Sequence, residues 1–229
     1  MRLLAACLVL LVFPTHAGSH PPPSTAQSPT RPAIEALVRD LQANYDAVTD
    51  FTASFEHEYQ GGLIRTSIVE HGTVVIKKPG KMLWRYTSAE DKLYVSDGST
   101  FYAYFPFDRQ VIATPVPSGD QASMPVLFLA GSGNLLEDFS AAYDEGPTDP
   151  GTWAIRLTPT RPEADYEWLV LRVDQTTLTL AGLSTIDGQG GRSTYRFTDL
   201  VENQNPPDSV FVFEIPDGVD VMADDGAIR

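Results

Sequence analysis

Residues 73–110 read TVVIKKPGKMLWRYTSAEDKLYVSDGSTFYAYFPFDRQ, and this stretch decides the fold. Its β-branched and aromatic runs are separated by Pro79-Gly80, by a charged turn and by Asp97-Gly98, which predicts consecutive antiparallel strands. Asp97-Gly98 predicts a hairpin turn of type I′, because that turn needs positive φ at both central residues. The strands are apolar at successive positions, whereas an antiparallel sheet with one solvent-exposed face is polar at every second position. We therefore expect both faces of this sheet to be covered.

The first 17 residues have the layout of a secretory signal peptide. Arg2 supplies a positive start, residues 3–13 are apolar, and residues 15–17 resemble a cleavage site. The apolar run is too short for a membrane span, which needs about 20 residues. Cys7 lies inside this run rather than after it, which disfavours a lipid-attachment signal. Removal of the signal would leave the mature protein without a cysteine.

Residues 18–32 are rich in Pro, Ser and Thr and predict a disordered linker, and residues 33–229 fit a single domain. The formal net charge is −14, from 16 basic and 30 acidic residues. This balance argues against a nucleic-acid partner and against permanent binding to an anionic membrane surface. We expect a soluble, exported, monomeric protein.

Two kinds of helix are expected. Apolar residues recur at three- and four-residue steps over residues 33–48, which predicts an amphipathic helix that packs on a sheet and either belongs only to the core or also lines a ligand cavity. The apolar segment 124–129 lies between Pro125 and Gly131 and predicts a short buried helix, a lid over an apolar surface. A second short helix at residues 135–139 continues this lid.

The rest of the chain predicts strands. Period-two alternation starts at Phe51 and ends at Tyr59, a returning strand is expected at residues 64–76, and another at 111–114. Further short strands are expected at residues 140–144, 152–158, 168–174, 178–187, 193–200 and 210–215. A next-neighbour sheet of this many strands curls. Its concave face would hold the helix, the lid and a cavity.

Catalytic and metal sites are not indicated. Ser96 lies in Val-Ser-Asp-Gly rather than in a nucleophile elbow, and neither a glycine-rich phosphate loop after a strand nor a zincin motif occurs. His57 and His71 could approach each other across the first hairpin, but two histidines without a third ligand make a weak metal site. We expect surface polar residues there, no metal, no cofactor and no enzymatic activity.

The order of five segments resembles the LolA family, the periplasmic carriers of outer-membrane lipoproteins. They are IKKPGKMLW (76–84), VSDGSTFYAYFPFDRQ (95–110), MPVLFLAG (124–131), DGQGGRSTYRF (187–197) and FVFEIPDGVDV (211–221). The resemblance extends over roughly residues 34–222. It implies an α+β, mainly β fold: an incomplete antiparallel β-barrel with an N-terminal helix and short apolar helices as a lid. It also implies a carrier that takes lipoproteins from an inner-membrane ABC transporter, shields their acyl chains and passes them to an outer-membrane receptor.

The resemblance implies site residues as well. The residue before the proline is usually an arginine in the family, where it acts as a latch on backbone groups of the lid helices. Lys78 stands there in this chain, without the planar fork of arginine. Lipid contact is expected from cavity and lid residues: Met82, Trp84, Val126, Leu127, Phe128 and Leu129, with Leu37 and Leu41 as further candidates.

The need for a carrier also follows from physical chemistry. Each buried methylene contributes about 0.8 kcal/mol, so an acyl chain of about fifteen methylenes resists leaving a bilayer by about 12 kcal/mol. Two alternatives share the same half-barrel: a lipid-sensing regulator of the periplasm, and a general binding protein for lipids or small apolar ligands. A lipidated outer-membrane receptor of the same fold is disfavoured, since no cysteine follows the signal peptide.

Overall fold

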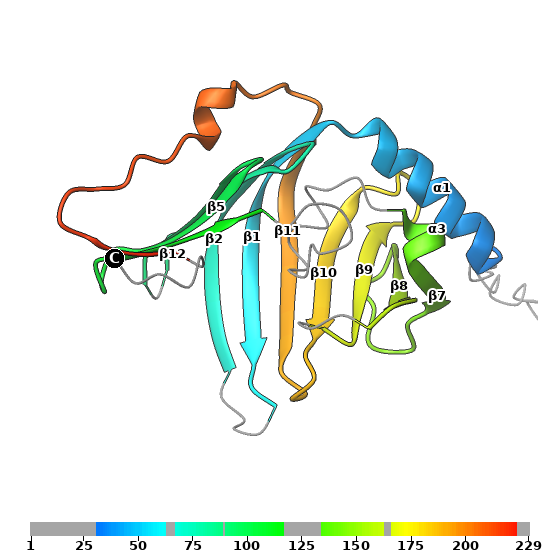
Figure 1. Cartoon of the computed structure of the whole chain (residues 1–229). Helices are drawn as coiled ribbons and strands as arrows, with labels where there is room; N and C mark the ends of the chain where they lie inside the picture. The colour runs from blue at the N-terminus through cyan, green and yellow to red at the C-terminus, as the bar shows by residue number, and fades with distance from the viewer. Residues whose placement is uncertain (1–30, 63–66, 89, 117–133, 163–165, 224–229) are drawn as a thin grey trace, which may run out of the picture. The chain divides into compact units, whose positions relative to one another are not determined.

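A computed structural model describes residues 31–62, 67–88, 90–116, 134–162 and 166–223 (Figure 1). The chain divides into two compact units, residues 1–31 and 32–229, and the second unit contains the elements given below. The expected signal peptide, nearly all of the linker and the lid segment 124–129 lie outside the described residues. In the described part of the chain, no helix combines the length and apolarity needed to span a membrane.

One curled sheet of twelve strands dominates the described residues, and it stays open, with β12 at one edge and β7 at the other (Figure 1). The spatial order is β12-β6-β5-β4-β3-β2-β1-β11-β10-β9-β8-β7. Neighbours pair antiparallel except β12, which runs parallel to β6. The strands are β1 Asp50–Gln60, β2 Ser67–Lys77, β3 Lys81–Tyr86, β4 Lys92–Asp97, β5 Thr100–Phe105, β6 Gln110–Pro115, β7 Phe139–Tyr143, β8 Thr152–Pro159, β9 Trp168–Asp174, β10 Leu180–Ile186, β11 Arg192–Glu202 and β12 Asp220–Ala223.

The inner face of the sheet is the face that carries Phe55, Trp84 and Phe197, and it packs against the helix α1 (Ile34–Ala47). α1 buries Leu37, Val38 and Leu41 in this core. Each large apolar side chain removed from water in this way stabilises the fold by about 1.5–3 kcal/mol. The mainly β fold and the position of the helix on the sheet are therefore confirmed.

A second, short helix lies beside α1. α3 (Leu135–Asp138) begins after Asn134, whose side chain accepts hydrogen bonds from the backbone N–H groups of Leu136 and Glu137. Gln42 of α1 accepts a hydrogen bond from the backbone N–H of Leu135 at 2.7 Å, so the two helices are joined directly. The short helix expected at residues 135–139 is confirmed.

The outer face is the opposite face. Both faces of the 73–110 sheet were expected to be covered, and α1, expected on the concave face, packs on the inner face. The 3₁₀ helix η2 (Asp208–Phe211) contacts β3 and β4, and its Phe211 is buried. The ring of Phe213 packs on Tyr102 and Tyr104, with centroids 5.3 and 5.7 Å apart. The C-terminal segment, defined here as residues 203–223, therefore covers this part of the outer face.

Two details of the sequence prediction are wrong. Residues 210–215 were expected to form a strand, yet η2 ends at Phe211, and the final strand β12 comes later. Pro206-Pro207 explains part of this difference, because proline cannot donate to a strand ladder and often precedes a helical turn. The β4–β5 hairpin is confirmed, but only Gly98 of its turn has positive φ (96°), as in type II′ rather than type I′.

Candidate functional site

An apolar cavity with a volume of about 60 Å³ lies between the C-terminal half of α1 and the inner face. Strands β1, β9 and β11 supply much of its wall, because their inward side chains meet α1 at this end of the sheet. The residues that line the cavity are Leu41, Asn44, Tyr45, Val48, Phe51, Lys78, Leu135, Leu171, Val173, Leu178, Leu180, Leu200 and Glu202. Most of them are apolar, so the cavity suits a hydrocarbon rather than a charged ligand.

The cavity is small for such a ligand. Sites for small organic ligands commonly have volumes of about 300–1,000 Å³, several times the volume found here. A complete acyl chain therefore does not fit this conformation. It would fit only if α1 moved away from the strands that it covers, and the contacts that hold α1 in place determine how readily this happens.

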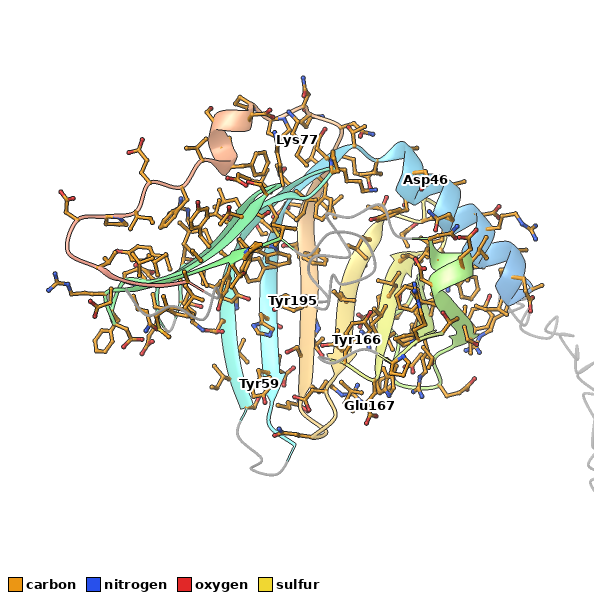
Figure 2. The ribbon with its side chains drawn as sticks, in the orientation of Figure 1. Asp46, Tyr59, Lys77, Tyr166, Glu167 and Tyr195 are labelled. Atoms are coloured by element: carbon orange, nitrogen blue, oxygen red, sulfur yellow. The ribbon has the colours of Figure 1, made fainter. Side chains whose placement is uncertain are left out.

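Lys78 is one of these contacts. It lies in the β2–β3 turn, and its Nζ donates a hydrogen bond to the backbone carbonyl of Tyr45, in the last turn of α1. The same Nζ lies 3.2 Å from the centroid of the Tyr45 ring. A cation is favourable there, because the C-terminus of a helix carries a partial negative charge. Figure 2 labels the neighbouring residues Asp46 and Lys77 at this end of the sheet.

The charge on Lys78 is only partly compensated. Burial lowers the pKa of Lys78 from 10.5 to about 8, while the carboxylates of Asp46 and Glu202 act in the opposite direction. Sequence reasoning placed the Lys78 latch on backbone groups of the lid. In the structure its partner is the backbone of α1, and residues 124–129 lie outside the described residues.

The other expected lipid-contact residues occupy different positions. Leu41 lines the cavity, whereas Leu37 is buried on the side of α1 that packs into the core and is not among the lining residues. Met82 and Trp84 are 0% and 1% exposed on the inner side of β3, and they do not line this cavity either. Sequence reasoning missed the lining residues of β9 to β11, of which Leu171 and Leu200 are examples. The alternation of apolar residues along these strands is visible in the sequence. The sequence does not show which of these apolar residues contact α1.

The histidines of the first hairpin are not arranged as expected. His57 pairs with Glu70 across β1 and β2, whereas His71 pairs with Glu56, so the two histidines lie on opposite faces. His71 is exposed, but the side chains of His57 and Glu70 are only 12% and 8% exposed. The prediction that these are all surface polar residues is therefore wrong for His57 and Glu70. Among the described residues, no group of three or more candidate ligands is placed to hold a metal ion.

The amino-acid sequence is similar to those of known proteins. The sequence matches the family model described as outer membrane lipoprotein carrier protein LolA over residues 46–214. It is 32% identical over 205 residues to the outer-membrane lipoprotein carrier protein of Chromohalobacter salexigens, an alignment that covers 89% of this chain and 92% of the relative. It is 28% identical over 223 residues to the protein of the same description from Cupriavidus pinatubonensis, covering 96% and 97%.

A solved structure resembles the fold. The uncharacterized conserved protein from Thermus thermophilus superposes with a TM-score of 0.51 at 10% sequence identity. The superposition covers 82% of this chain and 98% of the other. At this identity the likeness concerns the fold alone.

Proposed function

The chain belongs to the LolA family of outer-membrane lipoprotein carrier proteins, and from this membership we propose that it binds the acyl chains of lipoproteins between α1 and the inner face. The resemblance inferred from its five sequence segments is confirmed by the family match. The role is that of a carrier and not of an enzyme. The observation that supports the binding site is the apolar cavity beside Lys78.

Binding requires α1 to move. The acyl chain enters as α1 separates from β9 to β11. Leu41 of α1, Leu171 of β9 and Leu200 of β11 then contact methylene groups of the chain, and the helix and the strands no longer pack directly on each other. Lys78 holds the C-terminal turn of α1 in the closed state, as its contacts with Tyr45 indicate. Met82 and Trp84 extend the apolar wall along the inner face beyond the cavity, and residues 126–129 supply a further apolar cover, as their sequence suggests.

We propose the periplasm as the setting of this activity, which the signal-like N-terminus and the family membership support. Residues 1–17 direct export and are removed, and residues 18–32 act as a tether ahead of the carrier domain. The mature protein works as a monomer in the periplasm. It receives lipoproteins from an inner-membrane ABC transporter and delivers them to an outer-membrane lipoprotein receptor.

A release experiment tests the carrier site. Inner-membrane vesicles that contain the transporter and a radiolabelled lipoprotein are incubated with the purified mature protein and ATP, and soluble lipoprotein is measured. The protein is expected to release cargo as a one-to-one complex. Release no greater than with an inert periplasmic protein would contradict the proposal.

A matched pair of variants locates the cargo. Leu180→Gln makes a half-buried cavity residue polar, and Leu136→Gln makes the same change at an exposed position of α3. We expect the first variant to lose most of its release activity and the second to retain it, with both folded by circular dichroism. Equal activity of the two folded variants would place the acyl chains elsewhere. Equal affinity for free fatty acids and lipoproteins would instead favour a general lipid-binding protein.

A further inference from the structure

A cluster of polar side chains lies on the inner face, away from the cavity at Lys78. His57 of β1 stands between Glu70 of β2 and Tyr195 of β11, because it pairs with both across the sheet. Tyr86 of β3 and Lys92 of β4 are also paired and extend the cluster on the β2 side. Figure 2 shows Tyr195 about midway along the strands, between Lys77 at one end and Tyr59 at the other.

The contacts within the cluster fix the imidazole ring. The rings of His57 and Tyr195 are stacked, with centroids 4.2 Å apart and an interplanar angle of 3°. Nδ1 of His57 lies 3.6 Å from Oε2 of Glu70 and 3.4 Å from the hydroxyl of Tyr86. Lys92 Nζ lies 2.6 Å from the other oxygen of Glu70, so the buried carboxylate is paired with a cation. The cluster is therefore an ordered part of the inner face.

Two polar atoms at this place lack a partner. Nε2 of His57 and Nε1 of Trp84 are buried and form no hydrogen bond in the described structure. Trp84 is 1% exposed, and its ring centroid lies 5.3 Å from that of Tyr195, the residue stacked on His57. Buried polar atoms without a partner are uncommon in folded proteins and are destabilising. A ligand that supplied the missing partners would remove this cost.

The two atoms have opposite hydrogen-bonding roles. The carboxylate of Glu70 only accepts, so the hydrogen of a neutral His57 is assigned to Nδ1, and Nε2 is then an acceptor. Burial lowers the pKa of His57, an effect that Glu70 opposes and Lys92 reinforces, and this keeps the ring neutral at pH 7. The indole Nε1–H of Trp84 only donates. An amide offers both the donor that Nε2 of His57 needs and the acceptor that Nε1 of Trp84 needs, whereas an ester offers only the acceptor.

We propose that His57 and Trp84, oriented by Glu70 and Tyr195, form a polar subsite for the amide group that joins an acyl chain to its peptide. This inference rests on the proposed function. His57 is six residues beyond Phe51 on the same face of β1, and Phe51 lines the cavity. Six residues of a strand span about 20 Å, a length comparable with an extended acyl chain. A chain whose methyl end lies beside Lys78 therefore places its amide at His57.

Three probes of equal length test the subsite. They carry one hexadecyl-length chain and the same uncharged fluorophore, joined through an amide, an ester or a methylene. Affinities are measured by fluorescence titration of the purified mature protein. We expect the amide probe to bind about tenfold more tightly than the methylene probe, with the ester between them. Equal affinities of the amide and ester probes would overturn the assignment of Nε2 as an acceptor for a ligand.

A pair of histidine variants assigns the preference to its residue. His57→Phe keeps an aromatic ring for stacking on Tyr195 and removes Nε2, so the ratio of amide to methylene affinity is expected to fall close to one. His71→Phe makes the same change on the outer face, where the side chain is 56% exposed, and is expected to keep the wild-type ratio. A ratio that stays high in His57→Phe would overturn the proposal.

A measurement on the unaltered protein covers the case in which His57→Phe does not fold. The indole N–H resonance of Trp84 and the Nε2 resonance of His57 are followed by NMR during titration with the amide and methylene probes. We expect both to shift with the amide probe only, and identical responses to the two probes would overturn the subsite. Equal binding of all three probes would likewise remove the subsite and leave the carrier cavity intact. Failure of every probe to bind would reject the cavity itself.

Discussion

Replacement of Lys78 by methionine tests how α1 is held against the sheet. The side chain keeps a similar length and loses its charge, so the hydrogen bond to the Tyr45 carbonyl and the contact with the Tyr45 ring disappear. A hydrogen bond from a charged group is worth about 1.5–3 kcal/mol, and an exposed cation–π contact about 0.5–1 kcal/mol. Both contributions are lost together.

The burial of the charge acts in the opposite direction. A fall in the pKa of Lys78 from 10.5 to about 8 corresponds to at most about 3.4 kcal/mol, since each pKa unit is worth about 1.36 kcal/mol. The side chain is only half-buried, and solvent screening reduces this cost to roughly half. The difference leaves a net loss of about 1 kcal/mol in the free energy of unfolding, and the weakened contact lies at the C-terminal turn of α1.

Amide hydrogen exchange measures this local effect. The backbone N–H of Val48 bonds to the carbonyl of Asn44 at the end of α1, and a loss of about 1 kcal/mol there is expected to speed its exchange about fivefold. Lipoprotein transfer to a receptor is expected to accelerate by a similar factor. Lys77→Met is the matched control, because Lys77 binds Asp208 and the carbonyl of Pro206 instead of α1.

The Lys78→Met variant is also expected to differ from the wild type in how its stability depends on pH. The pKa of Lys78 is lower in the folded protein than in the unfolded chain, so the unfolded chain binds more protons between about pH 8 and 10.5. The stability of the wild type relative to Lys78→Met is therefore expected to rise across this window. Unchanged exchange at the end of α1, together with unchanged transfer, would refute the role assigned to Lys78.

Three further predictions concern other parts of the fold. Gly72→Ala is expected to cost about 2–3 kcal/mol in chemical denaturation, because its Cβ would clash with the backbone carbonyl oxygen of Arg85 and lie 2.6 Å from the Phe55 ring, whereas Gly188→Ala meets nothing within 4 Å and should be near neutral. Burial lowers the pKa of His57, so the unfolded chain takes up a proton first and stability should fall as pH drops through 6.5; a His57→Phe protein that shows the same fall would contradict this. Hydrogen bonds from Lys77 and Lys81 lower the pKa of Asp208 to about 2. The stability that these hydrogen bonds contribute should therefore be lost as pH falls from about 3.8 toward 2. Asp208→Asn should speed amide exchange in the C-terminal segment at pH 7, and an unchanged rate would show that these ion pairs do not fasten it.

The sheet was predictable because alternation is a local property. Phe51, Phe55 and His57 follow each other at even spacing, and the structure places all three on the inner face. This spacing already put His57 among apolar neighbours. The same pattern indicates its burial, because the position of a residue in the alternation sets the face on which its side chain lies.

The cavity and the C-terminal segment could not be predicted in the same way. The cavity forms where Leu171 and Leu200, on strands far apart in sequence from α1, meet that helix, and no local pattern records which strands will do so. β12 is short and exposed, and it owes its extended form to parallel pairing with β6. Phe211 is buried because η2 carries it onto β3 and β4, which is likewise a long-range contact.

The pairing of β1 with β11 has a consequence for how this protein folds. β1 to β6 and β7 to β11 are two successive meanders of neighbouring strands, and the β1–β11 ladder joins them. Arg196 and Glu56, for instance, meet across this ladder from 140 residues apart. Such non-local pairing slows folding. During synthesis, the free edge of β1 and the apolar inner face stay open to other chains until β11 has been made. This lipoprotein carrier thus passes through a stage in which its own apolar face is exposed to other chains.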